Sequence, residues 1–364
     1  MSPKAGIYIH VPFCTGKCPY CNFYSVRYDR TAAERYTEAV CRNCRQIPSE
    51  SEADTLYFGG GTPSLLSGEQ LKAIIRCVKE SCAFSEDAEI TLEANPLTVT
   101  DRALSAWKEA GINRLSLGVQ SFQSEVLEQL GRRHTPEQAA SAVRRAYDAG
   151  FENLSVDLMI GLANQEPDCF ARDLETACSL PVSHISAYLL KIEEHTPFYE
   201  NPPALLGSDA QAERYLMMHD YLTDRGFLHY EISNFAKPGF RSRHNCKYWR
   251  LEPYFAFGPS AHAFHGGKRY AVPHDLYAFC GSPLQPETVT ESDAGSLTER
   301  VMLGLRLSEG LCLADFPAVR EQLLRAAAPL IPQFLSLCDG RLSMTPEGWL
   351  VSNSVLVRLL EQIP

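Results

Sequence analysis

Short apolar segments alternate with longer amphipathic ones over the first half of this chain, and this alternation constrains its fold more than any other feature. The apolar segments have the length and composition of strands, and the segments between them repeat their apolar residues with a helical period. Strands that alternate with helices indicate βαβ units and a parallel sheet. The predicted strands are Gly6–Val11, Thr55–Phe58, Glu89–Glu93, Arg114–Val119, Leu154–Met159 and His184–Leu190.

Predicted helices fill the gaps between these strands. They are Thr31–Gln46, Gly68–Cys82, Thr100–Ala110, Ser124–Leu130, Pro136–Ala149 and Asp168–Cys178. A complete eight-fold barrel needs about 250 residues of continued alternation, whereas here the rhythm ends near residue 200. The expected core is therefore an α/β fold in the form of a partial (β/α)6 barrel.

The pattern changes after the Pro-rich segment Glu200–Gly207. A helix is predicted at Asp209–Arg225, and residues 230–290 show no clean period. Further helices are predicted at Thr298–Leu307, Phe316–Ala327 and Asn353–Gln362, with a hairpin at Arg341–Val351 around Pro-Glu-Gly. Helices with a short hairpin resemble a small winged-helix module. The expected parts are a core of residues 1–235, a connecting segment of residues 236–290 and a C-terminal domain of residues 291–364.

Charge and cysteine content narrow the class of protein. The formal net charge of −10 disfavours a surface that follows nucleic-acid phosphates, because such a surface needs clustered Lys and Arg. No apolar run reaches the ~18 residues of a membrane helix, and no signal peptide fits before the first strand. The thirteen cysteines are expected to be reduced thiols, some of them metal-bound. We therefore expect a cytoplasmic protein that is not transmembrane and binds no nucleic acid.

Three cysteines follow the first predicted strand with the spacing Cys-x3-Cys-x2-Cys, at Cys14, Cys18 and Cys21. Three thiolates can hold three irons of a cubane 4Fe–4S cluster and leave the fourth iron open to a small chelating molecule. Two other interpretations fit the spacing alone. One is a dithiol redox pair formed by Cys18 and Cys21, and the other is a zinc site with a distant fourth ligand.

A glycine-rich turn and several polar residues lie at the ends of the next strands. Gly59–Gly61 and Thr62 follow the second strand, and glycine lets the backbone approach a ligand closely. Glu93, Gln120 and Asp157 end or interrupt later strands. Ligands of such sheets collect at the carboxyl ends of the strands, and a buried carboxylate needs a partner. These residues are expected to face a ligand or cation, with a plain turn and local salt bridges as the alternatives.

The cysteine motif, preceded by Tyr-Ile-His-Val-Pro-Phe, resembles the radical SAM superfamily. The resemblance is closest to the branch of the HemW-type heme chaperones and the oxygen-independent coproporphyrinogen III dehydrogenase (HemN). It implies a 4Fe–4S cluster on the cysteines with S-adenosylmethionine (SAM) on the open iron. A reduced cluster would give SAM one electron, breaking its S–C5′ bond to yield methionine and a 5′-deoxyadenosyl radical. The positions that match SAM-contacting residues are Tyr8, Tyr20, Gly60, Gly61, Thr62, Glu93, Gln120, Arg132 and Asp157.

Two departures point away from the dehydrogenase and toward the chaperones. Phe23 stands where the dehydrogenase has a fourth cysteine, and only five residues precede Gly6, where the dehydrogenase has a long extension. The segment from His244 to Trp249 fits the His-Asn-x-x-Tyr-Trp signature of the chaperones. A neutral imidazole can ligate heme iron. His244 is therefore the candidate heme ligand, and hydrogen bonding to backbone groups is its alternative role.

Together these features imply a chaperone that binds a 4Fe–4S cluster, SAM and heme and delivers heme to recipient hemoproteins. The alternatives are coproporphyrinogen III dehydrogenase, which decarboxylates two propionate side chains, and another radical SAM modifying enzyme. The implied partners are heme or a porphyrin, the recipient hemoproteins and an electron donor. A homodimer is expected from the family alone, because the chain carries no local signal for one.

Overall fold

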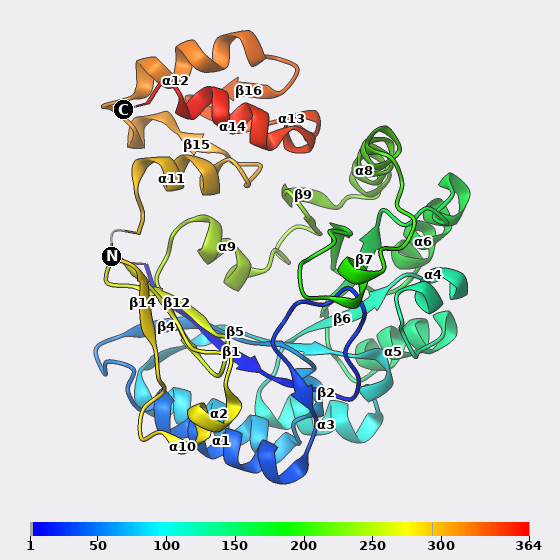
Figure 1. Ribbon diagram of the computed structural model, residues 1–364, viewed down its shortest axis with the longest axis vertical. Coiled ribbons are helices and arrows are strands. Elements are labelled where there is room, and N and C mark those ends of the chain that lie inside the picture. The colour runs from blue at the N-terminus through cyan, green and yellow to red at the C-terminus, as the bar shows by residue number, and fades with distance from the viewer. Residues whose placement is uncertain (1–2, 293, 364) are drawn as a thin grey trace.

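The computed structural model describes residues 3–292 and 294–363 of this 364-residue chain. The predicted strands form consecutive parallel neighbours of one curved sheet, open rather than closed in its strand order (Figure 1). They are β1 (Ala5–Val11), β4 (Glu52–Gly60), β5 (Ala83–Ala94), β6 (Arg114–Gln120), β7 (Asn153–Ile160) and β8 (His184–Leu189). The prediction of a partial barrel is therefore confirmed, although β4 and β5 begin earlier than predicted.

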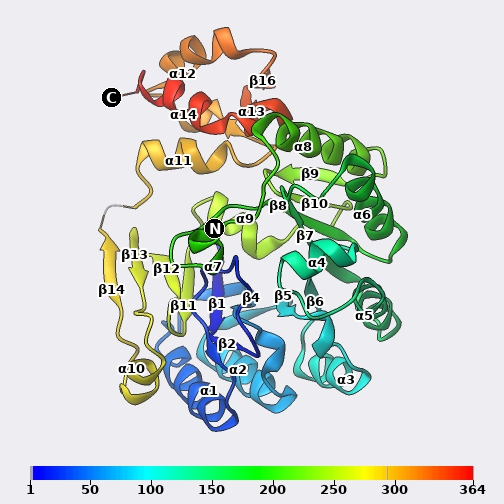
Figure 2. The same ribbon diagram turned by 45° about the vertical axis from the view of Figure 1, so that its right-hand side comes forward.

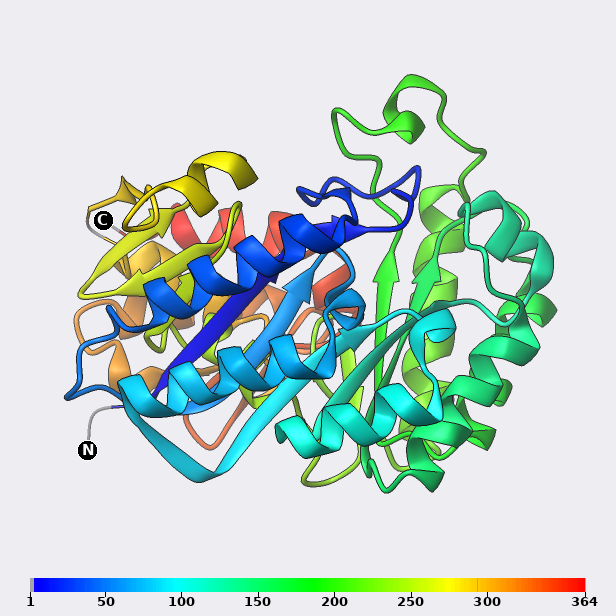
Figure 3. The same cartoon turned by 90° about the horizontal axis from the view of Figure 1, so that it is seen from below.

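The predicted helices lie outside this sheet, as the view from below shows (Figure 3). They are α1 (Arg30–Cys44), α2 (Gly68–Ser81), α3 (Asp101–Ala110), α4 (Ser124–Gln129), α5 (Pro136–Asp148), α6 (Pro167–Ser179) and α8 (Ser208–Thr223). Ser67 caps α2 and Thr135 caps α5, each in a capping box with a glutamine three residues later. The apolar faces of the helices pack on the sheet and form the main core, which includes Trp107.

The inner face of the sheet is polar where its strands end. In the register of the strands, Glu93 on β5 lies beside Ser116 on β6, and Asp157 on β7 lies beside Ser186 on β8. Successive side chains of a strand point to opposite faces, so the apolar residues between these positions face the helices. The sequence thus builds an apolar wall around a polar interior.

Residues 230–290, which show no period in the sequence, contribute to the main sheet. Beyond β8 it continues with β10 (Asn234–Ala236) and β9 (Leu228–Glu231). On the other side of β1, Figure 2 shows β11 (Tyr254–Phe257), β12 (His262–His265), β13 (Lys268–Ala271) and β14 (Thr288–Glu291). The segment 236–290, expected to be a connection, therefore contributes β11 to β14 to the main sheet, together with two short helices, α9 (Arg243–Trp249) and α10 (Leu276–Gly281). Strands of three or four residues are too short to reveal a period of two.

Helix α9 (Arg243–Trp249) contains the His-Asn-x-x-Tyr-Trp segment. It lies between the main sheet and the C-terminal module, with contacts to β4 on one side and α11 (Leu297–Gly304) on the other (Figure 1). Ser242 caps the helix by accepting a hydrogen bond from the Asn245 N–H. A segment that looked irregular in sequence is therefore a helix that packs between the main sheet and the C-terminal module.

The C-terminal module combines α11, α12 (Arg320–Ala327) and α14 (Ser352–Leu360) with a small antiparallel sheet. The sheet has the order β15 (Leu311–Cys312), β17 (Arg341–Met344), β16 (Leu335–Cys338). The predicted helices are confirmed, with α12 beginning later than expected. Among the described ranges 3–292 and 294–363, no helix has the length and apolar character needed to cross a membrane.

The position predicted for the C-terminal hairpin is wrong. β16 and β17 turn at Asp339 and Gly340, both of which have positive φ angles, as tight hairpin turns require. Pro346 is instead the first residue of a short helix, α13 (Pro346–Leu350), which Thr345 caps. A Thr-Pro pair is a helix-start signature, and it outweighs the turn preference of Pro-Glu-Gly here.

Candidate cofactor site

Cys14 is the last residue of β2 (Phe13–Cys14), and Cys18 and Cys21 lie on the loop that leads from it to β3 (Val26–Arg27). The two short strands pair in parallel and close the base of the loop. The Cys21 N–H donates to the Cys18 carbonyl at 3.1 Å, which folds the loop back on itself. All three cysteines are partly exposed free thiols, and burial raises the pKa of the Cys21 thiol. The loop therefore presents three thiols at one rim of the barrel.

The glycine turn after β4 is bonded directly to this loop. The Gly61 N–H donates to the Val11 carbonyl at 2.8 Å, and the Thr62 N–H donates to the Phe13 carbonyl at 2.7 Å. A Cβ on Gly61 would lie 2.7 Å from the Phe13 oxygen and 3.1 Å from Cys14 Sγ. Only glycine fits where the two backbone segments come this close. The turn and the cysteine loop therefore form one rigid rim.

A cavity of about 500 Å³ opens between this rim and the carboxyl ends of β5 to β8. Every residue predicted for the cluster or for SAM lines it, with the exception of Tyr8. The lining includes Cys14, Cys18, Tyr20, Cys21, Gly60, Gly61, Thr62, Glu93, Gln120, Arg132 and Asp157. Residues that are up to 143 positions apart in the sequence (157 − 14) therefore meet in one space.

Two carboxyl groups in this cavity are shielded from water. Burial raises the pKa of Glu93 from 4.5 to about 7, against the hydrogen bond that the Tyr57 hydroxyl donates to Oε1 at 2.8 Å. Burial also raises the pKa of Asp157 to about 6, against a hydrogen bond from Ser116 Oγ at 3.1 Å. Carboxylates held this way favour a ligand that brings hydroxyl donors or positive charge. SAM, a sulfonium with an amino group and a ribose, has both.

Arg132 supplies positive charge in the same cavity. Its Nη1 lies 3.5 Å from Cys18 Sγ, so it sits beside the cysteine loop. Among the described residues, its buried Nε atom has no hydrogen-bond partner. A guanidinium with an unused donor suits a carboxylate acceptor, such as the one in the methionine part of SAM. The neighbouring Arg133 is exposed and lies outside the cavity lining.

Gln120 ends β6 in the left-handed backbone region, with φ 73°. That conformation is costly for a residue with a side chain and persists only where the surroundings enforce it. Asp173 on α6 holds the two residues that follow: its carboxylate accepts from the Phe122 N–H and from Ser121 Oγ, both at 2.7 Å. Asp173 is almost completely buried. The sequence pattern does not reveal this residue, because Ser121 and Phe122 lie more than 50 positions away from it.

Asp173→Ala is expected to lower the free energy of unfolding by about 2–4 kcal/mol, because it leaves two buried donors without an acceptor. Urea unfolding followed by circular dichroism measures the change. Asp168→Ala, an exposed site in the first turn of the same helix, should cost no more than about 0.5 kcal/mol. An equal loss of unfolding free energy in the two variants would show that the contacts of Asp173 with Ser121 and Phe122 do not stabilise the fold.

The thiol arrangement bears on the zinc site that the spacing left open. Among the described residues, no three Cys, His, Asp or Glu side chains converge closely enough to hold a single metal ion. This argues against a zinc site. A cubane cluster takes its thiolates on separate irons, so it needs three thiols around a cavity rather than around one point. The residues present therefore fit a 4Fe–4S cluster with SAM beside it.

Tyr8 and His244 lie beneath the cavity rather than in its lining. The Tyr8 hydroxyl is 3.1 Å from His10 Nδ1. His244 is fully buried, with Nδ1 2.8 Å from Thr55 Oγ1 and Nε2 2.8 Å from the Tyr248 hydroxyl. Both ring nitrogens are thus engaged, and neither is open to an iron. Ligation of heme iron by His244 stays a prediction, and it would require one of these two contacts to open.

Several lining residues were not predicted, among them Asn95, Met159 and Tyr188. Met159 and Tyr188 are register partners on β7 and β8. Tyr188 also follows Ser186 by two positions, so it points to the same face of the sheet. Strand alternation could have found both residues, because each follows a polar residue of the same face by two positions within a predicted strand. Tyr188 is 40% exposed at the mouth of the cavity.

Comparisons with known proteins agree with this geometry. Residues 8–177 match the family model of the Radical SAM superfamily, and residues 295–351 match that of the HemN C-terminal domain. The fold is similar to that of coproporphyrinogen III oxidase (HemN) from Escherichia coli, with a TM-score of 0.81 at 20% identity, covering 98% of this chain and 90% of that one. The fold and the site together define a radical SAM protein.

Similarity to full-length relatives is more specific. The chain is 39% identical to "Heme chaperone HemW" of Escherichia coli, covering 99% of both proteins. It is 34% identical to the protein of the same name from Bacillus subtilis, over 98% of this chain and 99% of the relative. For the Lactococcus lactis protein the identity is 32%, over 97% and 96%. The chain belongs to the HemW family.

Proposed function

We propose that this protein is a heme chaperone that binds a 4Fe–4S cluster, SAM and heme and passes heme to recipient hemoproteins. The observation that carries the proposal is the similarity, over nearly the full length, to proteins named heme chaperone HemW. Phe23 adds support. It occupies the position of the fourth cysteine of the dehydrogenase, and it is 58% exposed on the rim of the cavity.

The site residues have the following proposed roles. Cys14, Cys18 and Cys21 hold the cluster, which when bound supplies the electron for reductive cleavage of SAM. The remaining lining residues bind and orient SAM. Glu93 accepts hydrogen bonds from the ribose hydroxyls, and Arg132 pairs with the methionine carboxylate. The SAM-contacting set proposed is Tyr20, Gly60, Gly61, Thr62, Glu93, Gln120, Arg132 and Asp157, with Tyr8 supporting them from below.

The partners and location remain part of the same proposal. They are the recipient hemoproteins, an electron donor that reduces the cluster, and the cytoplasm as the compartment in which reduced thiols persist. A homodimer is proposed from the family alone. We also propose that residues 291–364 form a domain of their own, which the family match to residues 295–351 supports. The cofactor body would then comprise residues 1–235 and the segment 236–290.

Anaerobic titration of the cluster-loaded protein with heme, followed by absorbance, tests the function. Saturable binding near one heme per chain is expected, followed by transfer when apomyoglobin is added as the recipient probe. Bovine serum albumin in place of this protein controls for nonspecific heme release. Absence of saturable binding would refute the proposal. Formation of protoporphyrinogen from coproporphyrinogen III with SAM and a reductant would replace it with the dehydrogenase.

A further inference from the structure

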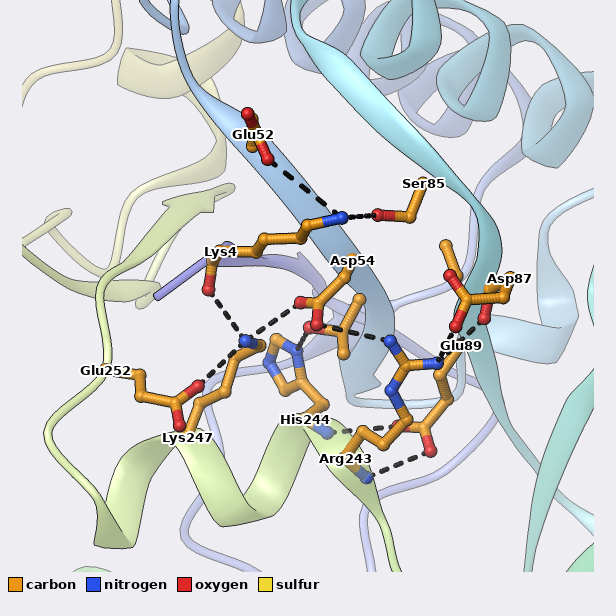
Figure 4. Close-up of polar contacts among 12 residues, drawn as sticks. Lys4, Glu52, Asp54, Ser85, Asp87, Glu89, Arg243, His244, Lys247 and Glu252 are labelled. Atoms are coloured by element: carbon orange, nitrogen blue, oxygen red, sulfur yellow. Dashed lines mark hydrogen bonds and ion pairs between the residues drawn. The ribbon is translucent and has the colours of Figure 1, made fainter. Parts of the chain in front are cut away.

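Ion pairs join α9 to the amino-terminal part of β4 (Figure 4), and none of the paired residues lines the cofactor cavity. Lys247 Nζ lies 2.8 Å from Asp54 Oδ1 and 2.9 Å from Glu252 Oε2, and it also donates to the Lys4 carbonyl at 2.7 Å. Lys247 is buried, so these contacts are poorly screened by solvent. They hold the helix against β4 and the start of β1.

The first turn of α9 is held by a second set of contacts (Figure 4). The backbone N–H groups of Arg243 and His244 donate to the two carboxylate oxygens of Glu89, at 3.0 and 3.1 Å. The Arg243 side chain reaches Asp54 at 3.2 Å and the Asp87 carbonyl at 2.8 Å. A buried carboxylate at a helix N-terminus satisfies donors that otherwise lack partners. The position of His244 is therefore set by the barrel wall.

The ring of His244 projects into the barrel interior. Burial lowers the pKa of His244 to about 3, with Lys247 and Arg114 adding to the effect, so the imidazole is neutral at physiological pH. Thr55 and Tyr248 bond its two nitrogens. A Cβ on Gly6 would lie 3.0 Å from the ring, so a larger residue there would press on it. The imidazole is thus fixed in orientation on every side.

Two tyrosines of the barrel interior stack on this ring. The centroid of the His244 ring is 5.2 Å from that of Tyr57, with an interplanar angle of 26°, and 6.4 Å from that of Tyr8. The Tyr57 hydroxyl is the group that donates to Glu93. A Cβ on Gly59 would lie within 3.2 Å of Tyr8, Tyr57 and Glu93. This packing leaves Tyr57 little freedom to move without moving Glu93.

From these contacts we propose that His244 is a positioning residue of the SAM pocket. Its neutral ring, fixed by α9, supports the ring of Tyr57, and the Tyr57 hydroxyl holds the Glu93 carboxylate in place for SAM. The His-Asn-x-x-Tyr-Trp segment thus packs against the amino-terminal part of the barrel and acts on the SAM pocket through Tyr57 and Glu93. The inference rests on the proposed binding of SAM and is independent of heme delivery.

The test compares cluster-loaded variants under anaerobic conditions. His244→Ala is expected to raise the SAM dissociation constant about tenfold, the size of one lost hydrogen bond to a charged group. It should also weaken the change that SAM produces in the electron paramagnetic resonance spectrum of the reduced cluster. Tyr57→Phe should have a similar effect. The SAM dissociation constant of the double variant should exceed that of the weaker-binding single variant by no more than about twofold, because both substitutions act through Glu93.

His184→Ala is the matched control. His184 is equally buried in the same barrel, and its ring nitrogens are bonded to Ser155 at 2.7 Å and to Tyr230 at 2.9 Å. Its ring packs edge-on against Tyr230 rather than on Tyr8 or Tyr57. We expect it to lose stability as His244→Ala does, while its SAM dissociation constant stays within about twofold of wild type. A loss of SAM affinity as large as that of His244→Ala would overturn the inference.

Further outcomes also overturn it. An unchanged SAM dissociation constant in His244→Ala would do so, and a loss of heme binding with intact SAM binding would make His244 a heme ligand instead. If His244→Ala fails to fold, Thr55→Val replaces it, since it removes the Nδ1 partner and preserves side-chain volume. SAM binding by Thr55→Val equal to that of wild type would then be decisive against the inference. Failure of the wild type to bind heme would count only against the proposed function.

Discussion

Replacing Cys18 with alanine is expected to abolish the iron–sulfur cluster and leave the chain folded. The cluster needs all three thiolates because each holds a different iron, so iron content should fall from about four atoms per chain to nearly none. Cys18 is partly exposed on a loop, so the free energy of unfolding of the cluster-free chain should change by no more than about 0.5 kcal/mol. Iron analysis and visible absorbance after anaerobic reconstitution measure the effect.

Cys178→Ala provides the control for this experiment. Cys178 on α6 is a free thiol of intermediate exposure like Cys18, but it lies outside the cavity lining. Its replacement should leave the iron content at the wild-type value. A Cys18→Ala protein that keeps its full cluster would mean that another of the cysteines is the third ligand. It would not affect the assignment of SAM to the glycine turn.

Glu93→Gln is expected to stabilise the protein and to weaken its binding of SAM. Between about pH 4.5 and 7 the folded protein keeps the proton on Glu93, whereas the unfolded chain has released it. The free energy of unfolding therefore falls as pH rises through this window. Glutamine cannot ionise, so the variant should be more stable by about 1–3 kcal/mol at pH 7.5 and nearly equal to wild type at pH 4.5. Urea unfolding without SAM at the two pH values measures this.

The same substitution should raise the SAM dissociation constant at least about tenfold, since one acceptor oxygen becomes a donor. Glu137→Gln is the control, because Glu137 is an exposed carboxylate on α5 and should give neither the gain in stability nor the loss of affinity. A Glu93→Gln protein that is less stable than wild type at pH 7.5 would show that Glu93 is paired and ionised in the folded state. A site that sacrifices stability for function is expected at a cofactor pocket.

Much of the cofactor site followed from the linear pattern. The spacing of the cysteines indicated a cluster with an open iron, and polar residues at strand ends pointed to the neighbouring pocket. Glu93 and Asp157 were found because parallel strands bring their carboxyl ends to one edge. Asp173 was not found, because its importance depends on contacts with distant residues. Tyr188 lies within a predicted strand but was not singled out.

His244 was assigned a role by its motif, and the structure places it differently. The sequence contains the histidine and its aromatic neighbours but does not say which way the ring points. Burial against β4 and bonds from both nitrogens decide that, and they place the ring in the barrel interior. The position predicted for the C-terminal hairpin was wrong because the helix-start signal at Thr345 and Pro346 competed with the turn signal of Pro-Glu-Gly.

The sequence alone predicted the alternating α/β fold, the three cysteines at the rim of the cavity and the class of cofactor, because these depend on local periodicity and on the chemistry of closely spaced residues. Only the tertiary structure decided how the short strands of residues 236–290 join the sheet and how α9 packs beneath the pocket. These depend on side-chain packing and buried ion pairs between segments far apart in the chain. Such contacts leave no periodic trace in a sequence, since their energies arise only after the barrel has brought the segments together.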